Sequence, residues 1–166
     1  KLKAMLLERP DIANLLLELD SRYRASQSVT VDGFKTFYKA IYLRELPVVA
    51  ESIAEAFVWA FANKKGVIEE AWRGFGKSTF LTAWAAYIVG ARPVGSTALV
   101  RINDKASQKT GATIAEIIET NPGWKQTFPH VVPDKDAGWS GENGYHVKDM
   151  RVVEKDGYDK WLQLCF

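Results

Sequence analysis

Ala71-Trp72-Arg73-Gly74-Phe75-Gly76-Lys77-Ser78-Thr79 is the stretch that decides the fold expected for this chain. A short apolar run with an acidic tail, Gly66-Val67-Ile68-Glu69-Glu70, comes before it, and an apolar segment with helical spacing follows it to residue 89. A strand, a glycine-bearing loop and a helix form the context in which a loop binds phosphate. The glycines let backbone N–H groups turn toward phosphate oxygens, and the helix N-terminus adds unpaired donors and partial positive charge. The pattern therefore predicts a nucleotide-binding loop.

The chemistry of phosphate binding also predicts what individual side chains of this loop would contact. Lys77 would reach the β- and γ-phosphates, and the Ser78 hydroxyl would ligate Mg²⁺ bound with ATP. Arg73 could stabilise charge on the γ-phosphate, so Arg73 and Lys77 are the candidate catalytic residues. The candidate nucleotide-binding residues are Trp72, Arg73, Gly74, Phe75, Gly76, Lys77, Ser78 and Thr79.

Two alternatives concern the same residues. The loop could be a glycine-rich turn in which Lys77 is only a solvated lysine, although a lysine at a helix start opposes the helix dipole. Arg73 could be a surface arginine paired with Glu69 or Glu70. The full pattern G-x-x-x-x-G-K-[ST] also asks for glycine at position 71, where this chain has alanine.

Residues 67–79 resemble the Walker A region of the large terminase subunits of tailed bacteriophages, whose loops often read Arg-Gly-x-Gly-Lys-Ser-Thr and tolerate loss of the first glycine. The likeness continues through a strand at 97–101, Asn103-Asp104, the run Glu119-Thr120-Asn121-Pro122, and Phe128-Pro129. It covers about residues 45 to 150, with its specificity concentrated in the nine loop residues.

The resemblance implies a DNA-packaging motor ATPase that uses ATP and Mg²⁺ to move double-stranded DNA into a capsid. It implies viral DNA, a small terminase subunit and the portal as partners, and assembly as a homo-oligomeric ring. The expected location is the host cell cytoplasm, transiently at the procapsid. In that family the adenine is held just upstream of the loop strand, where Tyr42 is a candidate. The arginine at the position of Arg73 is thought to sense the γ-phosphate.

The expected fold class is α/β, a P-loop NTPase core of mostly parallel sheet flanked by helices, with a helical N-terminal extension. Residues 1–46 would form the extension and residues 47–166 a partial ATPase domain. Phosphoryl transfer also needs an acidic pair after a second strand, but the chain contains no Asp-Glu or Asp-Asp pair. With the alternating apolar end at 161–166, this predicts truncation before the Walker B strand, and a chain that binds ATP but hydrolyses it poorly.

Periodicity and cap signals predict the other elements. Helices are expected over residues 1–24, split at Pro10, over residues 32–43 with Asp32 as N-cap, and from Pro47 onward. The helix after the loop should end at Val89 with Gly90 just beyond it, and a helix starting at Asp104 or Ser107 should stop at Asn121-Pro122. Strands are expected at 97–102, 145–153 and 160–166, the last two joined by an Asp156-Gly157 turn.

The composition is ordinary for a soluble globular protein and does not by itself indicate a function. Hydrophobic residues make up 47% and charged residues 25%, and the formal net charge is only +2. DNA contact would therefore depend on local basic residues such as Arg101, Lys105, Lys109 and Lys125, for which solvated helix charges are the alternative. One cysteine excludes an internal disulfide, and no apolar run reaches the roughly 20 residues that span a bilayer. A helicase-like ATPase, a small-molecule kinase and a non-catalytic interaction module remain the rival functions.

Overall fold

The computed structural model describes residues 11–12, 14–17, 19–20, 28–91, 96–98, 104–133, 149–154 and 159–163. Of residues 104, 96–98, 149–154 and 159–163 it describes the backbone alone. Residues 11–12, 14–17 and 19–20 are helical, in line with the helix expected near the N-terminus.

Within residues 28–70, two α-helices lead up to the glycine-bearing loop. Helix α3 spans Val31–Tyr42, and its N-cap is Thr30, whose hydroxyl accepts a 3.0 Å hydrogen bond from the Gly33 N–H. The prediction of Asp32 as N-cap is wrong by two residues, because Thr30 has the extended backbone that a cap requires while Asp32 lies in the first turn. Pro47 begins a 3₁₀ turn, η1 (Val48–Ala50), which continues into α4 (Glu51–Asn63).

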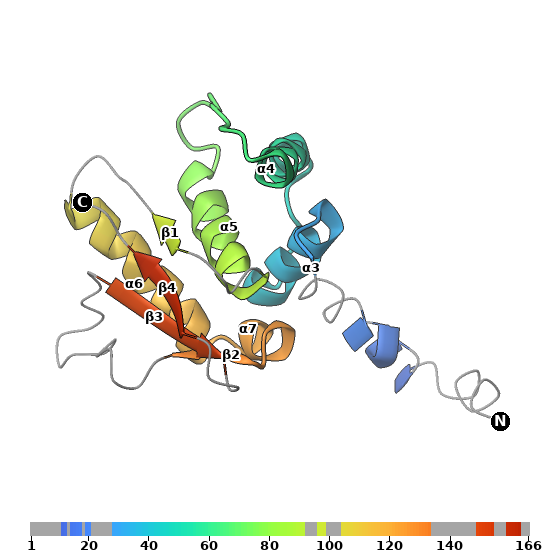
Figure 1. The fold of residues 1–166 in the computed structure, drawn as a ribbon. Coiled ribbons are helices and arrows are strands. Elements are labelled where there is room, and N and C mark those ends of the chain that lie inside the picture. The colour runs from blue at the N-terminus through green and yellow to red at the C-terminus, as the bar shows by residue number, and fades with distance from the viewer. Residues whose placement is uncertain are drawn as a thin grey trace.

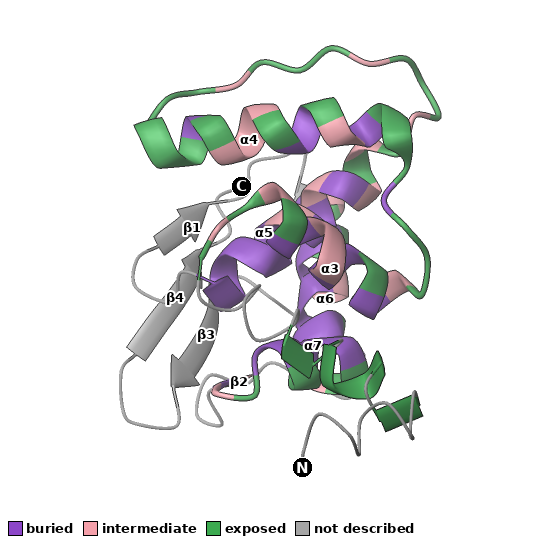
Figure 2. Cartoon of the chain, turned by 90° about the vertical axis from the view of Figure 1, so that its right-hand side faces the viewer, coloured by how far each residue is buried: buried purple, intermediate pink, exposed green. Residues whose placement is uncertain are grey.

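Helix α5 (Lys77–Ala91) is the central element, lying between α3 on one side and α6 (Asp104–Thr120) on the other (Figure 1). Apolar and small side chains of α5 itself lie on several of its faces, and Figure 2 shows most of the helix buried. A helix that is apolar around most of its circumference belongs in a core. In the first turn of α5, by contrast, Ser78 is exposed and Lys77 and Thr79 are half-buried.

An aromatic cluster fills the space between α3, α5 and the short helix α7 (Pro122–Thr127). The Phe37 ring lies 5.5 Å from Tyr87, 6.0 Å from Trp124 and 5.5 Å from Phe128, measured between ring centroids. All four side chains are completely buried. Aromatic side chains bury more apolar area per residue than other side chains, so this cluster contributes strongly to the free energy of folding.

Gly90 lies inside α5 and not beyond its end, so the predicted stop at Val89 is wrong. The Phe128 ring packs so closely on Gly90 that a Cβ there would overlap the ring atoms. The glycine signal thus reflects close helix packing and not a helix C-cap. Helix α6, in contrast, ends at Thr120 as predicted, and Asn121 caps α7 by accepting a 2.8 Å hydrogen bond from the Gly123 N–H.

Within the part of the chain that the structure describes, four strands pair in the order β1-β4-β3-β2. They are β1 (Ser96–Ala98), β2 (Val131–Pro133), β3 (Asp149–Glu154) and β4 (Asp159–Gln163). Strands β3 and β4 pair antiparallel with Val153 opposite Asp159, as the predicted hairpin requires, while its Asp156-Gly157 turn lies outside the described residues. Strand β2 pairs antiparallel with β3, and β1 pairs parallel with β4.

These observations overturn the predicted P-loop NTPase core of mostly parallel sheet. Of the residues whose side chains are described, 72% are helical, and the strand among them is the short β2. In the described pairings, antiparallel contacts join β2 to β3 and β3 to β4, so the sheet is not mainly parallel. The fold is therefore a helical body beside a small mixed sheet.

The expected strand at Gly66–Glu70 does not form, and its surface position explains why. Residues 65–70 have no regular secondary structure, and the Ile68 side chain is 94% exposed. The central strand of a P-loop core is buried on both faces between neighbouring strands. Two apolar residues between Lys64-Lys65 and Glu69-Glu70 supply too little apolar area for such burial.

Replacing Gly123 by alanine should lower the free energy of unfolding by about 1–3 kcal/mol, because the new Cβ would overlap the backbone carbonyl of Ala40 and force α3 and α7 apart. Urea denaturation followed by circular dichroism measures this change. Gly66→Ala is the matched control, since no atom lies within 4 Å of a Cβ placed there. Equal stability of the two variants would contradict the close helix contact.

Tyr87 should make the free energy of unfolding fall as the pH rises in the alkaline range. Burial raises the pKa of its hydroxyl above the usual 10.0, and that hydroxyl donates a 2.9 Å hydrogen bond to the Ser28 carbonyl. Because the folded-state pKa is raised, the protonated Tyr87 hydroxyl contributes fully to the free energy of unfolding below about pH 10. This contribution is lost as the pH rises through the folded-state pKa. Tyr87→Phe should therefore flatten the alkaline fall of the unfolding free energy, which urea titrations between pH 8 and pH 11 can measure, with Tyr38→Phe as control.

Candidate functional site

Gly74 and Gly76 give the loop before α5 its shape. Their φ angles are +90° and +91°, in the region that L-residues with a side chain rarely adopt. A Cβ at either position would meet no atom within 4 Å, so the requirement for glycine comes from the backbone angle and not from crowding. Both predicted loop glycines thus have a conformational reason to be glycine.

The loop leads directly into the N-terminus of α5. The Phe80 N–H donates the first helical hydrogen bond to the Gly76 carbonyl at 2.9 Å. The N–H groups of Lys77, Ser78 and Thr79 then precede the first residue that has an intrahelical acceptor. Three unpaired donors and the positive end of a central helix therefore face the loop, as an anion site requires.

The Lys77 side chain folds back over the loop. Its ammonium group donates to the Ala71 carbonyl and, at 2.7 Å, to the Trp72 carbonyl. The loop backbone thus wraps around a positive charge beside the unpaired N–H groups. The Trp72 and Phe75 rings meet edge to face at 4.9 Å, and Trp72 remains 68% exposed.

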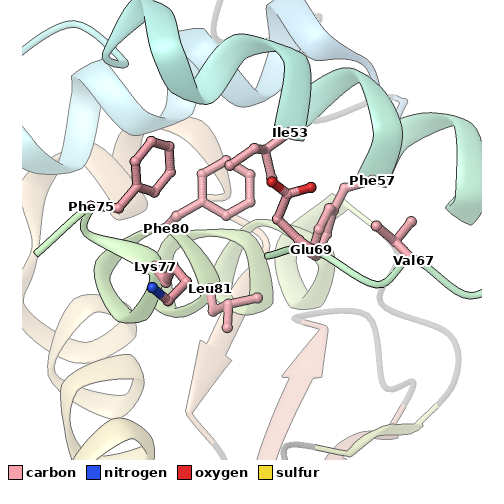
Figure 3. Close-up of a pocket in the computed structure, with 8 residues that line it drawn as sticks. All are labelled: Ile53, Phe57, Val67, Glu69, Phe75, Lys77, Phe80 and Leu81. Atoms are coloured by element: carbon pink, nitrogen blue, oxygen red, sulfur yellow. The ribbon is translucent and has the colours of Figure 1, made fainter. Parts of the chain in front are cut away.

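One cavity of about 200 Å³ opens beside the loop, between α4, residues 67–69 and α5 (Figure 3). Figure 3 shows the Glu69 carboxylate on the far side of this cavity from the Lys77 ammonium, with no ion pair recorded between them. Its other walls are apolar, formed by Ile53, Phe57, Val67, Phe75, Phe80 and Leu81. The cavity suits apolar contacts better than charged ones.

A second cavity, of about 290 Å³, lies on the other side of the loop. Gly74, Gly76 and Thr79 line it together with Tyr38 and Arg44. The Arg44 guanidinium donates to the Tyr38 hydroxyl at 3.4 Å and lies 5.7 Å from the centroid of a neighbouring tyrosine ring, that of Tyr42. The sequence offered no signal for Tyr38 and Arg44, because they precede the loop by 33 and 27 residues.

The structure separates the remaining predicted residues into groups. Arg73 and Ser78 are exposed at the loop and at the first turn of α5, and no ion pair from Arg73 to Glu69 or Glu70 is recorded within the described residues. Tyr42 lines a third cavity that also touches Ser78 and Thr79. Lys105 and Lys109 are exposed on α6 and Lys125 on α7, while Arg101 lies outside the described residues.

No group of three or more His, Cys, Asp or Glu side chains comes together within the described part of the chain. Among the described helices, none has both the length and the apolar character that crossing a bilayer takes.

Gly76→Ala should lower the free energy of unfolding by about 1–3 kcal/mol, because a residue with a Cβ is strained at a φ near +90°. Urea denaturation measures the loss, and Gly66→Ala again serves as control because neither crowding nor a positive φ applies there. A loss no larger than that of the control would show that the loop does not need this backbone angle.

Comparison of the chain with protein-family models, with curated proteins and with solved structures finds no match.

Proposed function

We propose that residues 71–79 bind the phosphates of ATP together with Mg²⁺. The observation that carries this proposal is the loop itself, in which Gly74 and Gly76 adopt positive φ angles directly before a helix that starts at Lys77. Loop, ammonium group and unpaired helix N–H groups supply the donors and the charge that phosphate oxygens need. No regular strand before the loop is required for these contacts.

Each predicted loop residue has a role in this proposal. The Lys77 ammonium exchanges its two carbonyl acceptors for phosphate oxygens, which are stronger acceptors because they are charged. Arg73 is exposed beside the loop and neutralises charge on the terminal phosphate. Trp72 and Phe75 form an aromatic wall at the loop, against which a nucleotide can pack.

The site offers one ligand for the metal that accompanies ATP. The exposed Ser78 hydroxyl in the first turn of α5 would hold Mg²⁺, with phosphate oxygens and water completing the octahedron. A single protein oxygen fits a metal that arrives with its nucleotide, because Mg²⁺ retains several waters in such sites. The metal would neutralise phosphate charge and orient the phosphates.

The larger role follows from the terminase resemblance of the loop. On that basis we propose that the chain is the ATP-binding part of a viral DNA-packaging motor. In it, ATP hydrolysis would drive double-stranded DNA into a capsid in the host cytoplasm, with a small terminase subunit and the portal as partners. The absence of an Asp-Glu pair from these 166 residues supports slow hydrolysis by this chain alone.

Lys77→Ala should weaken the binding of a fluorescent ATP analogue in the presence of Mg²⁺ by about 10- to 100-fold, the range expected for losing hydrogen bonds from one charged group. A fluorescence titration of the full chain measures the affinity. Lys125→Ala removes the same charge from an exposed position on α7 and should leave binding unchanged.

The titration separates the rival functions. Equal binding by the Lys77→Ala variant and the unaltered chain would exclude the proposed phosphate loop. Absence of binding by the unaltered chain would favour a non-catalytic interaction module. ATP binding with transfer to a small molecule, and not to water, would favour a kinase.

A further inference from the structure

A third cavity, of about 430 Å³, lies beyond the first turn of α5, between the C-terminal turn of α3 and helix α6. Its lining is rich in hydroxyl groups, contributed by Tyr42, Ser78, Thr79, Thr82, Thr110 and Thr113. Among the described residues that line it, Lys109 is the one charged residue and none is a carboxylate. A cavity whose one charged side chain is a lysine favours an anion over a cation.

The hydroxyl groups divide into acceptors and donors. Thr82 donates to the Ser78 carbonyl at 2.7 Å and Thr110 to the Ala106 carbonyl at 3.0 Å, so each directs its proton into its own helix. The Ser78 hydroxyl is exposed and can donate. Burial raises the pKa of the Tyr42 hydroxyl, which keeps that group protonated as a second donor.

Lys109 supplies the charge. Its side chain is exposed, and neither of the ion pairs recorded within the described part of the chain includes it. Lys77, by contrast, is already bonded to two loop carbonyls. Lys109 is therefore an ammonium group that can take an anionic partner without breaking a recorded ion pair.

The cavity adjoins the proposed phosphate loop through Thr79. This residue lines both the hydroxyl-rich cavity and the cavity that contains Gly74 and Gly76. A chain of phosphates lying along the loop would thus have one end at Ser78, facing α6. The first turn of α5 therefore has a lysine on each side: Lys77 beside the loop and Lys109 on α6.

We propose that Lys109 binds the terminal phosphate of a nucleoside triphosphate in this cavity, so that the site distinguishes a triphosphate from a diphosphate. This inference rests on the proposed phosphate loop, because the loop places the phosphates beside Ser78. Lys109 acts as a specificity residue, and helix α6 becomes the element that contacts the phosphate lost on hydrolysis.

The test compares two nucleotides in the full chain. Lys109→Ala should weaken the binding of ATPγS with Mg²⁺ about tenfold, as expected for one charge-assisted hydrogen bond, and leave ADP affinity within twofold of the unaltered chain. Isothermal titration calorimetry measures both affinities. Lys109→Arg, which keeps the charge, should restore most of the preference for the triphosphate.

The controls assign every outcome. Lys125→Ala should change neither affinity. Equal weakening of ATPγS and ADP, or no weakening of either, would overturn the role of Lys109 while leaving the phosphate loop in place, provided that Lys77→Ala weakens the binding of both nucleotides. Failure of the unaltered chain to bind both nucleotides would overturn the loop and the Lys109 inference together.

Discussion

The packing of the Phe37 ring against Tyr87, Trp124 and Phe128 is the interaction on which the rest of this structure depends. It joins α3, α5 and α7, which are far apart in the sequence, into one body. Tyr87 extends this connection to the segment before α3 by donating to the Ser28 carbonyl. Helix α5 is thereby held along its C-terminal half, and its first turn, at the other end, follows directly from the loop at 71–76.

This arrangement separates the buried, closely packed half of α5 from the helix end that carries the proposed binding groups. The buried half of α5 has little freedom because its neighbours are close-packed rings and small side chains. The opposite end presents Lys77, Ser78 and Thr79 to three separate cavities. A ligand at this helix end can therefore touch α3, α4 and α6 without disturbing the core.

Local signals in the sequence predicted local features well. The helix start at Lys77, the need for glycine at 74 and 76, and the end of α6 before Asn121-Pro122 all follow from short-range backbone chemistry. The fold class did not follow, because a P-loop core needs strands on both sides of residues 66–70, and partners of that kind are a matter of tertiary pairing. Gly90 was misinterpreted for the same reason, since its partner Phe128 lies 38 positions away in the chain. Tyr38, Arg44 and Lys109 join the loop only through helix packing, which no motif encodes.

The Lys77 ammonium donates hydrogen bonds to the Ala71 and Trp72 carbonyls. These two loop carbonyls occupy the donors that the proposed phosphate would use. A phosphate bound as proposed would have to displace these two carbonyls, so its net gain in free energy would be the difference between two sets of hydrogen-bond partners. When the phosphate departs, the carbonyls are beside the ammonium and can recapture it at once. Such an exchange lowers affinity but shortens the residence time of the bound anion. It suits a site that must release its ligand repeatedly more than one that stores it.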